Sequence, residues 1–245
     1  IAGGGEDGGK ILEKGDAALV HKLRGKPSNN GYSPAVKTTA LTYVRRRYTD
    51  FGPTLLAETL EEQHDLRLSR ETLRRWMLAE GLWQRVMKGR RHRKRRPRRS
   101  CIGELVQFDG SHHDWFEGRG APCCLFVFID DASSRSLFYF AETEDEHAAL
   151  TVLLLYILRY GIPRALYLDR HAVYKSDGVV TQFARACAVL GIELIHARSP
   201  QAKGRVERAN RTHQDRLVKK MRLAGIADIA SANAFLEEEY IDEHN

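Results

Sequence analysis

The sequence predicts an α/β protein in which a mixed five-stranded sheet with flanking helices follows a small all-α domain. From residue 101 onward, apolar strand-like runs come first and then alternate with helical segments over about 125 residues. Residues 35–84 hold three helical segments, and a strongly basic stretch at 85–100 separates the two regions. A chain of 245 residues with 42% apolar content is long enough for two such domains.

The first domain is predicted at residues 35–84 from the signals that begin and end helices. Pro53 suits a first helical position, Ser69 suits an N-cap, and Gly81 suits a helix end. The three expected helices cover Val36–Tyr48, Pro53–Gln63 and Arg70–Glu80.

The third helix of this domain has an apolar face and a charged face. Leu73, Trp76 and Met77 share the first, while Glu71, Arg74 and Arg75 point away from it. This pattern is typical of a helix-turn-helix whose cationic side reads DNA, and it makes Arg70, Arg74 and Arg75 candidate DNA contacts. A three-helix bundle with ordinary solvated arginines explains the same pattern equally well, but the position before a basic linker and a nuclease-like core favours a helix-turn-helix DNA-binding domain at residues 35–84.

The excess positive charge of the chain lies in one segment. The formal net charge is +7, and residues 88–99 contain nine Lys or Arg and no acid, so the remaining residues sum to −2. Like charges at this density favour a solvated linker, expected at 85–100, that binds a polyanion by releasing counterions. A solubilising tail is the alternative, although a position between two folded regions does not suit it. The candidate DNA contacts here are Arg90, Arg91, Arg93, Lys94, Arg95 and Arg96.

Residues 1–34 are expected to be a flexible or partial N-terminal segment. The chain begins with Ile1 in a Gly-rich stretch, without a signal peptide, so we interpret it as truncated or processed. The longest apolar run, 148–157, is too short and too interrupted to cross a bilayer. Four cysteines without a disulfide pattern indicate a reducing compartment.

The second domain, at residues 101–225, has a readable order of elements. Three strands are expected to form an antiparallel meander, and helices then alternate with two further strands. The expected strands are Glu104–Asp109, Pro122–Asp130, Ser136–Phe140, Arg164–Asp169 and Glu193–His196, and the expected helices are Glu146–Tyr160, Val180–Leu190 and a long helix containing Glu207. Residues 226–245 are expected to be a truncated C-terminal extension.

Three carboxylates stand where such a fold would bring them together. Asp109 and Asp169 end strand-like runs, and Glu207 opens the long helix. Each alone has an ordinary explanation as a turn cap or a helix-dipole partner. Together they supply the hard oxygen ligands that suit two Mg²⁺ or Mn²⁺ ions, which can activate an attacking oxygen and stabilise the leaving one. If the two strands lie side by side and parallel, both Asp residues emerge at neighbouring carboxyl ends.

The helix that contains Glu207 can bury one edge and expose another. Its buried stripe is predicted at Val206, Ala209, His213 and Leu217. Glu207 falls about 100° from Val206, on the side shared with Lys203, Asn210 and Gln214. Lys203, Arg208 and Arg211 are candidates for holding DNA phosphates, and a solvated helix face is the equal alternative for each.

Four stretches of the second domain, 103–120, 128–133, 168–171 and 199–211, carry a family resemblance. The region from Gly103 to about Gly225 resembles the catalytic core of the retroviral-integrase superfamily, in particular bacterial insertion-sequence transposases of the ISNCY group. The resemblance implies an RNase H-like fold and a DDE triad of Asp109, Asp169 and Glu207. Here 37 residues separate the last two acids, and integrases have about two fewer, a difference that a loop absorbs.

The same resemblance implies a DNA transposase that cleaves the 3′ ends of an insertion sequence and transfers the strands to target DNA. It would use two Mg²⁺ or Mn²⁺ ions per active site, bind double-stranded DNA at transposon ends and target, and act as a homo-oligomer in a synaptic complex. The expected location is the bacterial cytoplasm, in association with the nucleoid. A non-catalytic transposase-derived regulator and an RNase H-like nuclease remain alternatives.

Other polar residues are given structural explanations. The adjacent pairs His112-His113 and Cys123-Cys124 lack the two-residue gap that lets neighbouring ligands hold one ion, so the sequence does not predict zinc. Asp130 and Asp131 are expected to cap a turn, and His171 to make a local hydrogen bond. Residues 114–116 belong to the family's motif without a role that the sequence explains.

Overall fold

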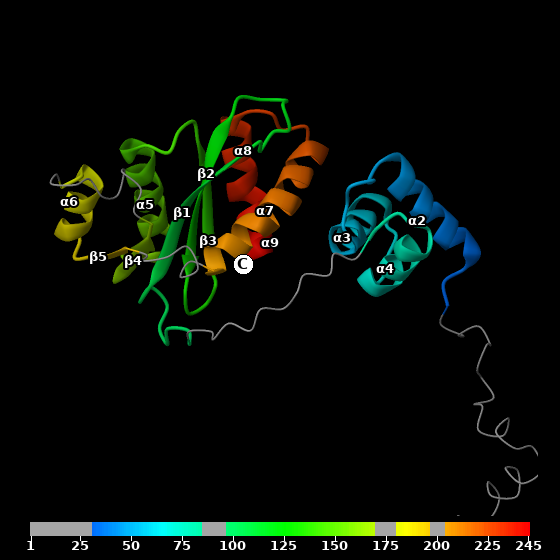
Figure 1. Cartoon of the computed structure of the whole chain (residues 1–245), viewed down its shortest axis with the longest axis horizontal. Coiled ribbons are helices and arrows are strands. Elements are labelled where there is room, and N and C mark those ends of the chain that lie inside the picture. Colours follow the sequence, from blue (N-terminus) through cyan, green and yellow to red (C-terminus); the bar gives the residue numbers. More distant parts are fainter. Residues whose placement is uncertain (1–30, 85–96, 170–179, 197–203) are drawn as a thin grey trace, which may run out of the picture. The chain divides into compact units, whose positions relative to one another are not determined.

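In a computed structural model of the protein, the residues whose structure is described are 31–84, 97–169, 180–196 and 204–245 (Figure 1). It divides into two compact units, which adjoin in the sequence at Lys88 and Gly89.

The N-terminal unit consists of three helices, α2 (Pro34–Arg46), α3 (Pro53–His64) and α4 (Arg70–Ala79). The side chains of Ser33 and Ser69 accept hydrogen bonds from the first turns of α2 and α4, and Pro53 opens α3. All three predicted helices are confirmed, with ends shifted by no more than about two residues.

Apolar side chains from all three helices form the core of this unit. Leu41, Leu56 and Leu73 are almost fully buried, and Tyr48 adds a buried ring whose hydroxyl donates to Gln63 Oε1 at 2.9 Å. At the surface, Glu80 pairs with Lys37 and Arg45 of α2. The unit is therefore a small bundle with its own core.

The second unit is built on a mixed five-stranded sheet in the order β3-β2-β1-β4-β5 (Figure 1). The pairs β1–β2 and β2–β3 are antiparallel, whereas the pairs β1–β4 and β4–β5 are parallel. This confirms the predicted sheet, including the parallel pairing on which the convergence of the two Asp residues depends. The strands are β1 (Val106–His113), β2 (Cys123–Asp130), β3 (Ser136–Ala141), β4 (Ala165–Leu168) and β5 (Glu193–His196).

β1 is longer than the sequence suggested. The prediction that this strand ends at Asp109 is wrong, because β1 continues to His113 and pairs with β2 along its whole length. The apolar run of β2 extends far enough to give the polar residues after Asp109 backbone partners. Asp109 consequently lies in the middle of a paired strand.

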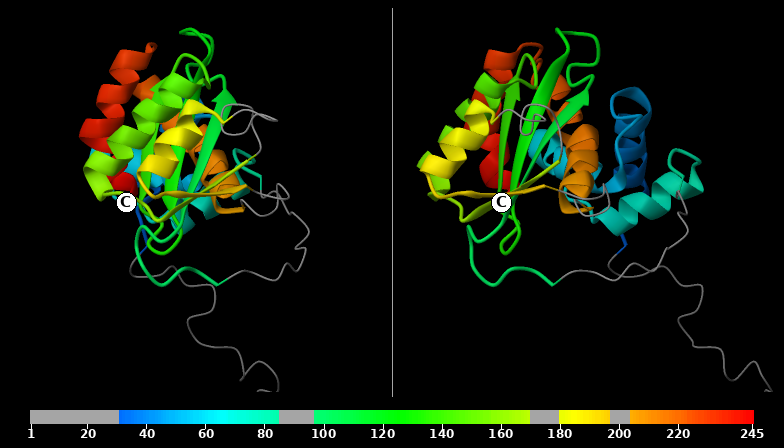
Figure 2. Two further views of the ribbon diagram at one scale, coloured as in Figure 1. Left: turned by 90° about the vertical axis from the view of Figure 1, so that its left-hand side faces the viewer. Right: turned by 60° about the vertical axis from the view of Figure 1, so that its left-hand side comes forward.

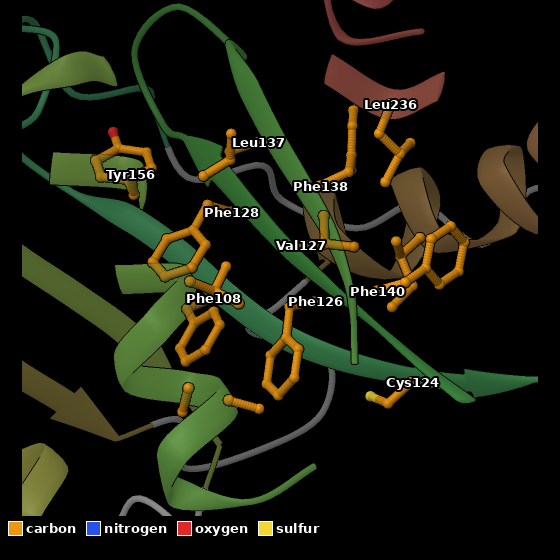
Figure 3. Close-up of a cluster of buried hydrophobic side chains, with 14 of the residues drawn as sticks. Phe108, Cys124, Phe126, Val127, Phe128, Leu137, Phe138, Phe140, Tyr156 and Leu236 are labelled. Carbon is orange, nitrogen blue, oxygen red and sulfur yellow. The ribbon is translucent and has the colours of Figure 1, made fainter. Parts of the chain in front are cut away.

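Helices cover both faces of the sheet. α5 (Glu146–Tyr160) and α6 (Gln182–Val189) lie on one face, in front of the sheet in the left view of Figure 2. The rings of Phe108 and Phe128 stack there with centroids 4.2 Å apart, and Figure 3 places them on the side of Tyr156. The other face carries α7 (Gly204–Leu223), α8 (Ile229–Phe235), the π-helical turn η3 (Leu236–Tyr240) and α9 (Ile241–His244).

The segment after α7 packs onto the sheet. Leu236, Tyr240 and Ile241 are buried in the same core as the strands. Two asparagines also bond to the backbone of the edge strand β3. Asn233 Oδ1 accepts from Phe140 N at 2.7 Å and its Nδ2 donates to Phe140 O at 2.9 Å, while Asn245 makes the same pair with Ser136 at 2.6 and 3.0 Å.

The loop between β1 and β2 is fastened to the end of α7. Trp115 is buried and its indole N–H donates to Ser111 O at 3.0 Å, and Arg119 donates to Ile226 O at 2.8 Å. Gly120 lies so close to residue 227 that a Cβ on it would stand 2.0 Å from Ala227 O. The loop at 115–120, which includes part of the 114–116 motif that the sequence left without a role, therefore holds the C-terminal end of the helix whose first turn contains Glu207.

A buried histidine connects α7 to the C-terminal segment. His213 is inaccessible to solvent, its Nδ1 lies 2.8 Å from Tyr240 Oη, and among the described residues its Nε2 has no hydrogen-bond partner. Burial, followed by the charges of His244 and Arg216, lowers the pKa of His213 to about 3. The ring is neutral in the folded protein at pH 7.

This histidine should make the second unit sensitive to acid. The unfolded imidazole gains a proton near pH 6.5, whereas the folded one does not until about pH 3, so stability present above pH 6.5 is lost progressively between these values. As the pH falls through this window, we expect protonation of His213 in the unfolded chain to lower the free energy of unfolding by about 1.4 kcal/mol per pH unit. Urea titration at pH 7 and pH 5 measures this decrease. In His213→Gln the pH slope should flatten; an unchanged slope would mean that other groups cause it.

None of the helices in the described part of the chain is long and apolar enough to span a membrane. The four cysteines are free thiols, and three of them are buried in the second unit.

Candidate active site

The two aspartates of the predicted triad are neighbours across parallel strands. β1 and β4 pair with Val106 opposite Leu166 and Gln107 opposite Tyr167. Continued for two residues, this register sets Asp109 opposite Asp169, and both side chains are partly buried. Asp169 is also fixed from β5, because its carbonyl oxygen lies 3.1 Å from His196 Nδ1.

A ladder of side-chain contacts joins β1 to α7. Residues at every second position of the strand meet residues four apart on the helix, which is the spacing at which a strand face and a helix face coincide. Val206 N donates to Gln107 Oε1 at 3.4 Å, Asn210 Nδ2 donates to Asp109 Oδ2 at 3.1 Å, and Gln214 Nε2 donates to Ser111 Oγ at 3.3 Å.

Glu207 lies beside this ladder on α7, and its side chain is exposed. Glu207 follows Val206 and precedes Asn210 by three residues, a rise of about 4.5 Å along the helix. Of the predicted face that Glu207 shares with Asn210 and Gln214, the latter two residues contact β1, whereas Glu207 is exposed. The predicted buried stripe agrees, since Val206, His213 and Leu217 are inaccessible and Ala209 is partly buried.

The residues around Asp109 fit a hydrated divalent cation. The three carboxylates offer only hard oxygen donors, which Mg²⁺ prefers. Asn210 Oδ1 is buried and, within the described residues, has no hydrogen-bond partner, although the same amide donates to Asp109. A water on a cation at Asp109 would provide the missing donor.

A second group of potential ligands lies on the opposite face of β1. Among the described residues, one group of three His, Cys, Asp or Glu side chains has all its ligand atoms within 4.8 Å of one another, and it is His112, Cys124 and Glu144 rather than the triad. The sequence argument considered only adjacent residues and so missed this group. Burial, followed by the Glu144 carboxylate, raises the pKa of the Cys124 thiol to about 12.

The predicted DNA-contact residues differ in how accessible they are. Arg70 and Arg75 on α4 are exposed, as are Arg208 and Arg211 on α7. Arg74 forms a two-point ion pair with Glu71 on its own helix, at 2.6 and 2.8 Å. The remaining candidates, together with His171, lie outside the described residues; they are Arg90, Arg91, Arg93, Lys94, Arg95, Arg96 and Lys203.

Asp130 acts as the turn cap that the sequence predicted. Its Oδ1 accepts from the backbone and hydroxyl of Ser133, both at 2.7 Å, and its Oδ2 accepts from Gly103 N at 2.8 Å. Asp131 accepts from Arg99 N and Gln107 Nε2. Both carboxylates thereby fasten the segment that leads into β1.

Sequence reasoning left several positioning residues without a role. Asn210 and Gln214 were grouped with Glu207, but only the fold gives them strand partners. Gln107 carried a signal, since it lies two residues before Asp109 and shares its strand face. Glu144 carried none, because it follows β3 in a loop and meets β1 only through the folded sheet.

The arrangement defines the class of fold: an RNase H-like sheet with flanking helices, as in integrase catalytic cores. A chain of the simian T-cell lymphotropic virus intasome, solved in complex with PP2A regulatory subunit B56 gamma, aligns with a TM-score of 0.51 and 20% identity, over 80% of this chain and 66% of that one. The magnesium complex of the HTLV-2 integrase catalytic core domain in its dimeric form aligns with a TM-score of 0.45 and 20% identity, over 54% of this chain and 82% of that one.

The chain is similar in sequence to two transposases. The chain is 46% identical over 244 residues to "Putative transposase y4bF" of Sinorhizobium fredii, covering 96% of this chain and 53% of the relative. It is 39% identical over 151 residues to the transposase for insertion sequence IS1202 of Streptococcus pneumoniae, covering 58% of this chain and 32% of the relative. No family model matches.

These matches confirm the resemblance to insertion-sequence transposases with an integrase-type core. The chain spans about half of the first relative's length and about a third of the second's.

Proposed function

We propose that this chain contains the catalytic part of a DDE transposase, in which Asp109, Asp169 and Glu207 hold two Mg²⁺ or Mn²⁺ ions. The observation that carries the proposal is the contact between Asn210 and Asp109. Through it, the helix of Glu207 meets the strand that pairs with the Asp169 strand. Sequence similarity to two transposases supports the same class of reaction.

The protein's own groups in this proposal position the reactants. Two divalent cations would activate the attacking oxygen and stabilise the leaving one, so no protein nucleophile is needed. Asn210 holds one oxygen of Asp109, and Gln107 binds the backbone at the start of α7. Together they hold Asp109 and the start of α7 in place before DNA binds, which would lower the cost of organising the site.

The proposed substrate is double-stranded DNA, as transposon ends and as target. Exposed Arg70 and Arg75 on α4 offer a cationic face for DNA reading, and exposed Arg208 and Arg211 follow Glu207 on α7. The basic segment 88–99 supplies sequence-independent attraction to phosphates. We further propose that the protein works as a homo-oligomer that pairs two transposon ends, at the nucleoid of a bacterial cell.

The test uses labelled duplexes that carry the terminal sequences flanking the gene, with a supercoiled target plasmid and Mg²⁺ or Mn²⁺. We expect nicking at the 3′ transposon end followed by joining to the plasmid, both abolished by EDTA. Cleavage of DNA or of an RNA–DNA hybrid without joining would favour the nuclease. Binding to the ends without cleavage, under all metal conditions, would favour the regulator.

Asn210→Ala should weaken this site without dismantling it. The substitution removes the donor to Asp109 and leaves the helix intact, and losses of about 10–100-fold in metal affinity or activity are typical when such a supporting residue is removed. We expect slower end cleavage and a higher metal concentration for half-maximal rate. Gln214→Ala is the matched control, because it removes the next contact of the ladder, to Ser111, and should change the rate little.

A further inference from the structure

His112 and Cys124 face each other across the sheet. The β1–β2 register pairs these two residues directly, so their side chains leave the same face, and that face is opposite to the one that presents Asp109 to α7. Cys124 is inaccessible to solvent, whereas the His112 side chain is 65% exposed. The thiol therefore lies on the buried side of this group, and the imidazole lies on the side that solvent reaches.

Glu144 completes this group from the loop between β3 and α5. Its side chain is only 9% exposed, and its Oε2 lies 3.0 Å from His112 Nε2. The carboxylate rests on the backbone of β1 at Gly110, where a Cβ would stand 2.5 Å from Glu144 Cδ. The absence of a side chain at residue 110 therefore allows the carboxylate to reach His112 and Cys124.

We propose that His112, Cys124 and Glu144 form a Zn²⁺ site, separate from the carboxylates of the triad. One sulfur, one imidazole nitrogen and one carboxylate oxygen are a donor set that zinc favours and magnesium does not. All three ligand atoms already lie within 4.8 Å of one another. Ligand atoms of a tetrahedral zinc ion stand about 3.5 Å apart, and His112 Nε2 and Glu144 Oε2 are already 3.0 Å apart; a water would take the fourth position.

Binding would link three segments of the core. The ligands come from β1, β2 and the loop that leads into α5, so one ion would join the strand of Asp109 to its neighbour and to the β3–α5 connection. The thiol proton passes to solvent when the Zn–S bond forms, so affinity should fall as the pH is lowered. The inference stands independently of the proposed transposase activity, because it needs no DNA and no catalysis.

The first test is X-ray absorption spectroscopy at the zinc edge, on the wild-type full chain from which metals have been removed and to which one equivalent of Zn²⁺ has been added. We expect one sulfur at about 2.3 Å and nitrogen or oxygen ligands at about 2.0–2.1 Å. Zinc bound by oxygen ligands without sulfur would place it at the triad and overturn the proposal. Failure to retain one equivalent on dialysis would do the same.

The neighbouring cross-strand pair, His113 and Cys123, supplies the control. These residues have the same chemistry and also face each other in the register, but they leave the opposite face of the sheet. With Co²⁺ as a probe, His112→Gln and Cys124→Ser should lose the thiolate-to-cobalt absorption and weaken Zn²⁺ binding by at least about 100-fold. His113→Gln and Cys123→Ser should keep both. Equal losses in the two pairs would overturn the assignment.

Gly110→Ala tests the role of Glu144 without changing a ligand. The new methyl group meets the end of a flexible side chain, so the carboxylate should move away while the fold persists. We expect the thiolate-to-cobalt absorption to remain, because sulfur and imidazole are untouched, with Zn²⁺ affinity reduced by about tenfold or more. Unchanged affinity would exclude Glu144 as a ligand.

Discussion

Asp109→Asn and Asp169→Asn are expected to abolish end cleavage and strand joining together, each by a factor on the order of 10³ or more. An amide keeps the shape of the side chain but removes the negative charge that attracts a divalent cation. Both residues are partly buried on paired strands, so the fold should persist. Single-turnover cleavage of labelled transposon ends measures the loss, and retained binding of the same DNA in a gel-shift assay shows that the protein is intact.

Asp215→Asn is the matched control for these variants. Asp215 lies on α7, two turns beyond Glu207, and pairs with Lys219 on the same helix. Its removal subtracts the same charge from the same unit and should leave the cleavage rate close to that of the wild type. If Asp109→Asn retained cleavage, or if Asp215→Asn lost as much, the assignment of the triad would fail.

Gly120→Ala should produce the largest loss of stability among the substitutions considered. The added Cβ would stand 2.0 Å from the backbone oxygen of Ala227 and 2.9 Å from the Phe116 ring, and neither can move as a flexible side chain could. Accommodating it requires the β1–β2 loop to separate from the end of α7. We expect a decrease of about 3 kcal/mol in the free energy of unfolding, measured by urea titration.

Gly118→Ala separates this packing effect from backbone strain. Gly118 has a φ of +71° but open space where a Cβ would lie, so its replacement should cost about 1 kcal/mol through the left-handed backbone alone. If the two substitutions lowered the free energy of unfolding equally, the close contact with residue 227 would not be the reason that position 120 requires glycine.

The secondary structure followed from local patterns because the patterns were unambiguous. α5 and β5 begin and end at the predicted residues, since Asp145 caps the helix and Gly161 ends it, and the short strand stands between turns. β1 was underestimated because its second half is polar and becomes a strand only by pairing with β2. The docking of residues 229–241 against β3 and α7 also depends on long-range packing, which no local pattern reports.

The candidate site was predictable to the extent that it depends on periodicity. Helical spacing placed Glu207 on the side of Asn210, and the order of strands placed Asp109 near Asp169. The hydrogen bond that connects these two predictions, from Asn210 to Asp109, required the packing of α7 on β1. The His112, Cys124 and Glu144 group was invisible for a similar reason, because its members lie 12 and 20 residues apart in the sequence.

The two asparagine contacts on β3 have a consequence for how copies of this protein can assemble. An uncovered edge strand invites another chain to continue the sheet, which is a common route to both assembly and aggregation. At Ser136 and Phe140 the amide groups of Asn245 and Asn233 take the place of that missing strand. A second molecule can therefore extend the sheet past β3 only by first displacing Asn233 and Asn245 from this edge.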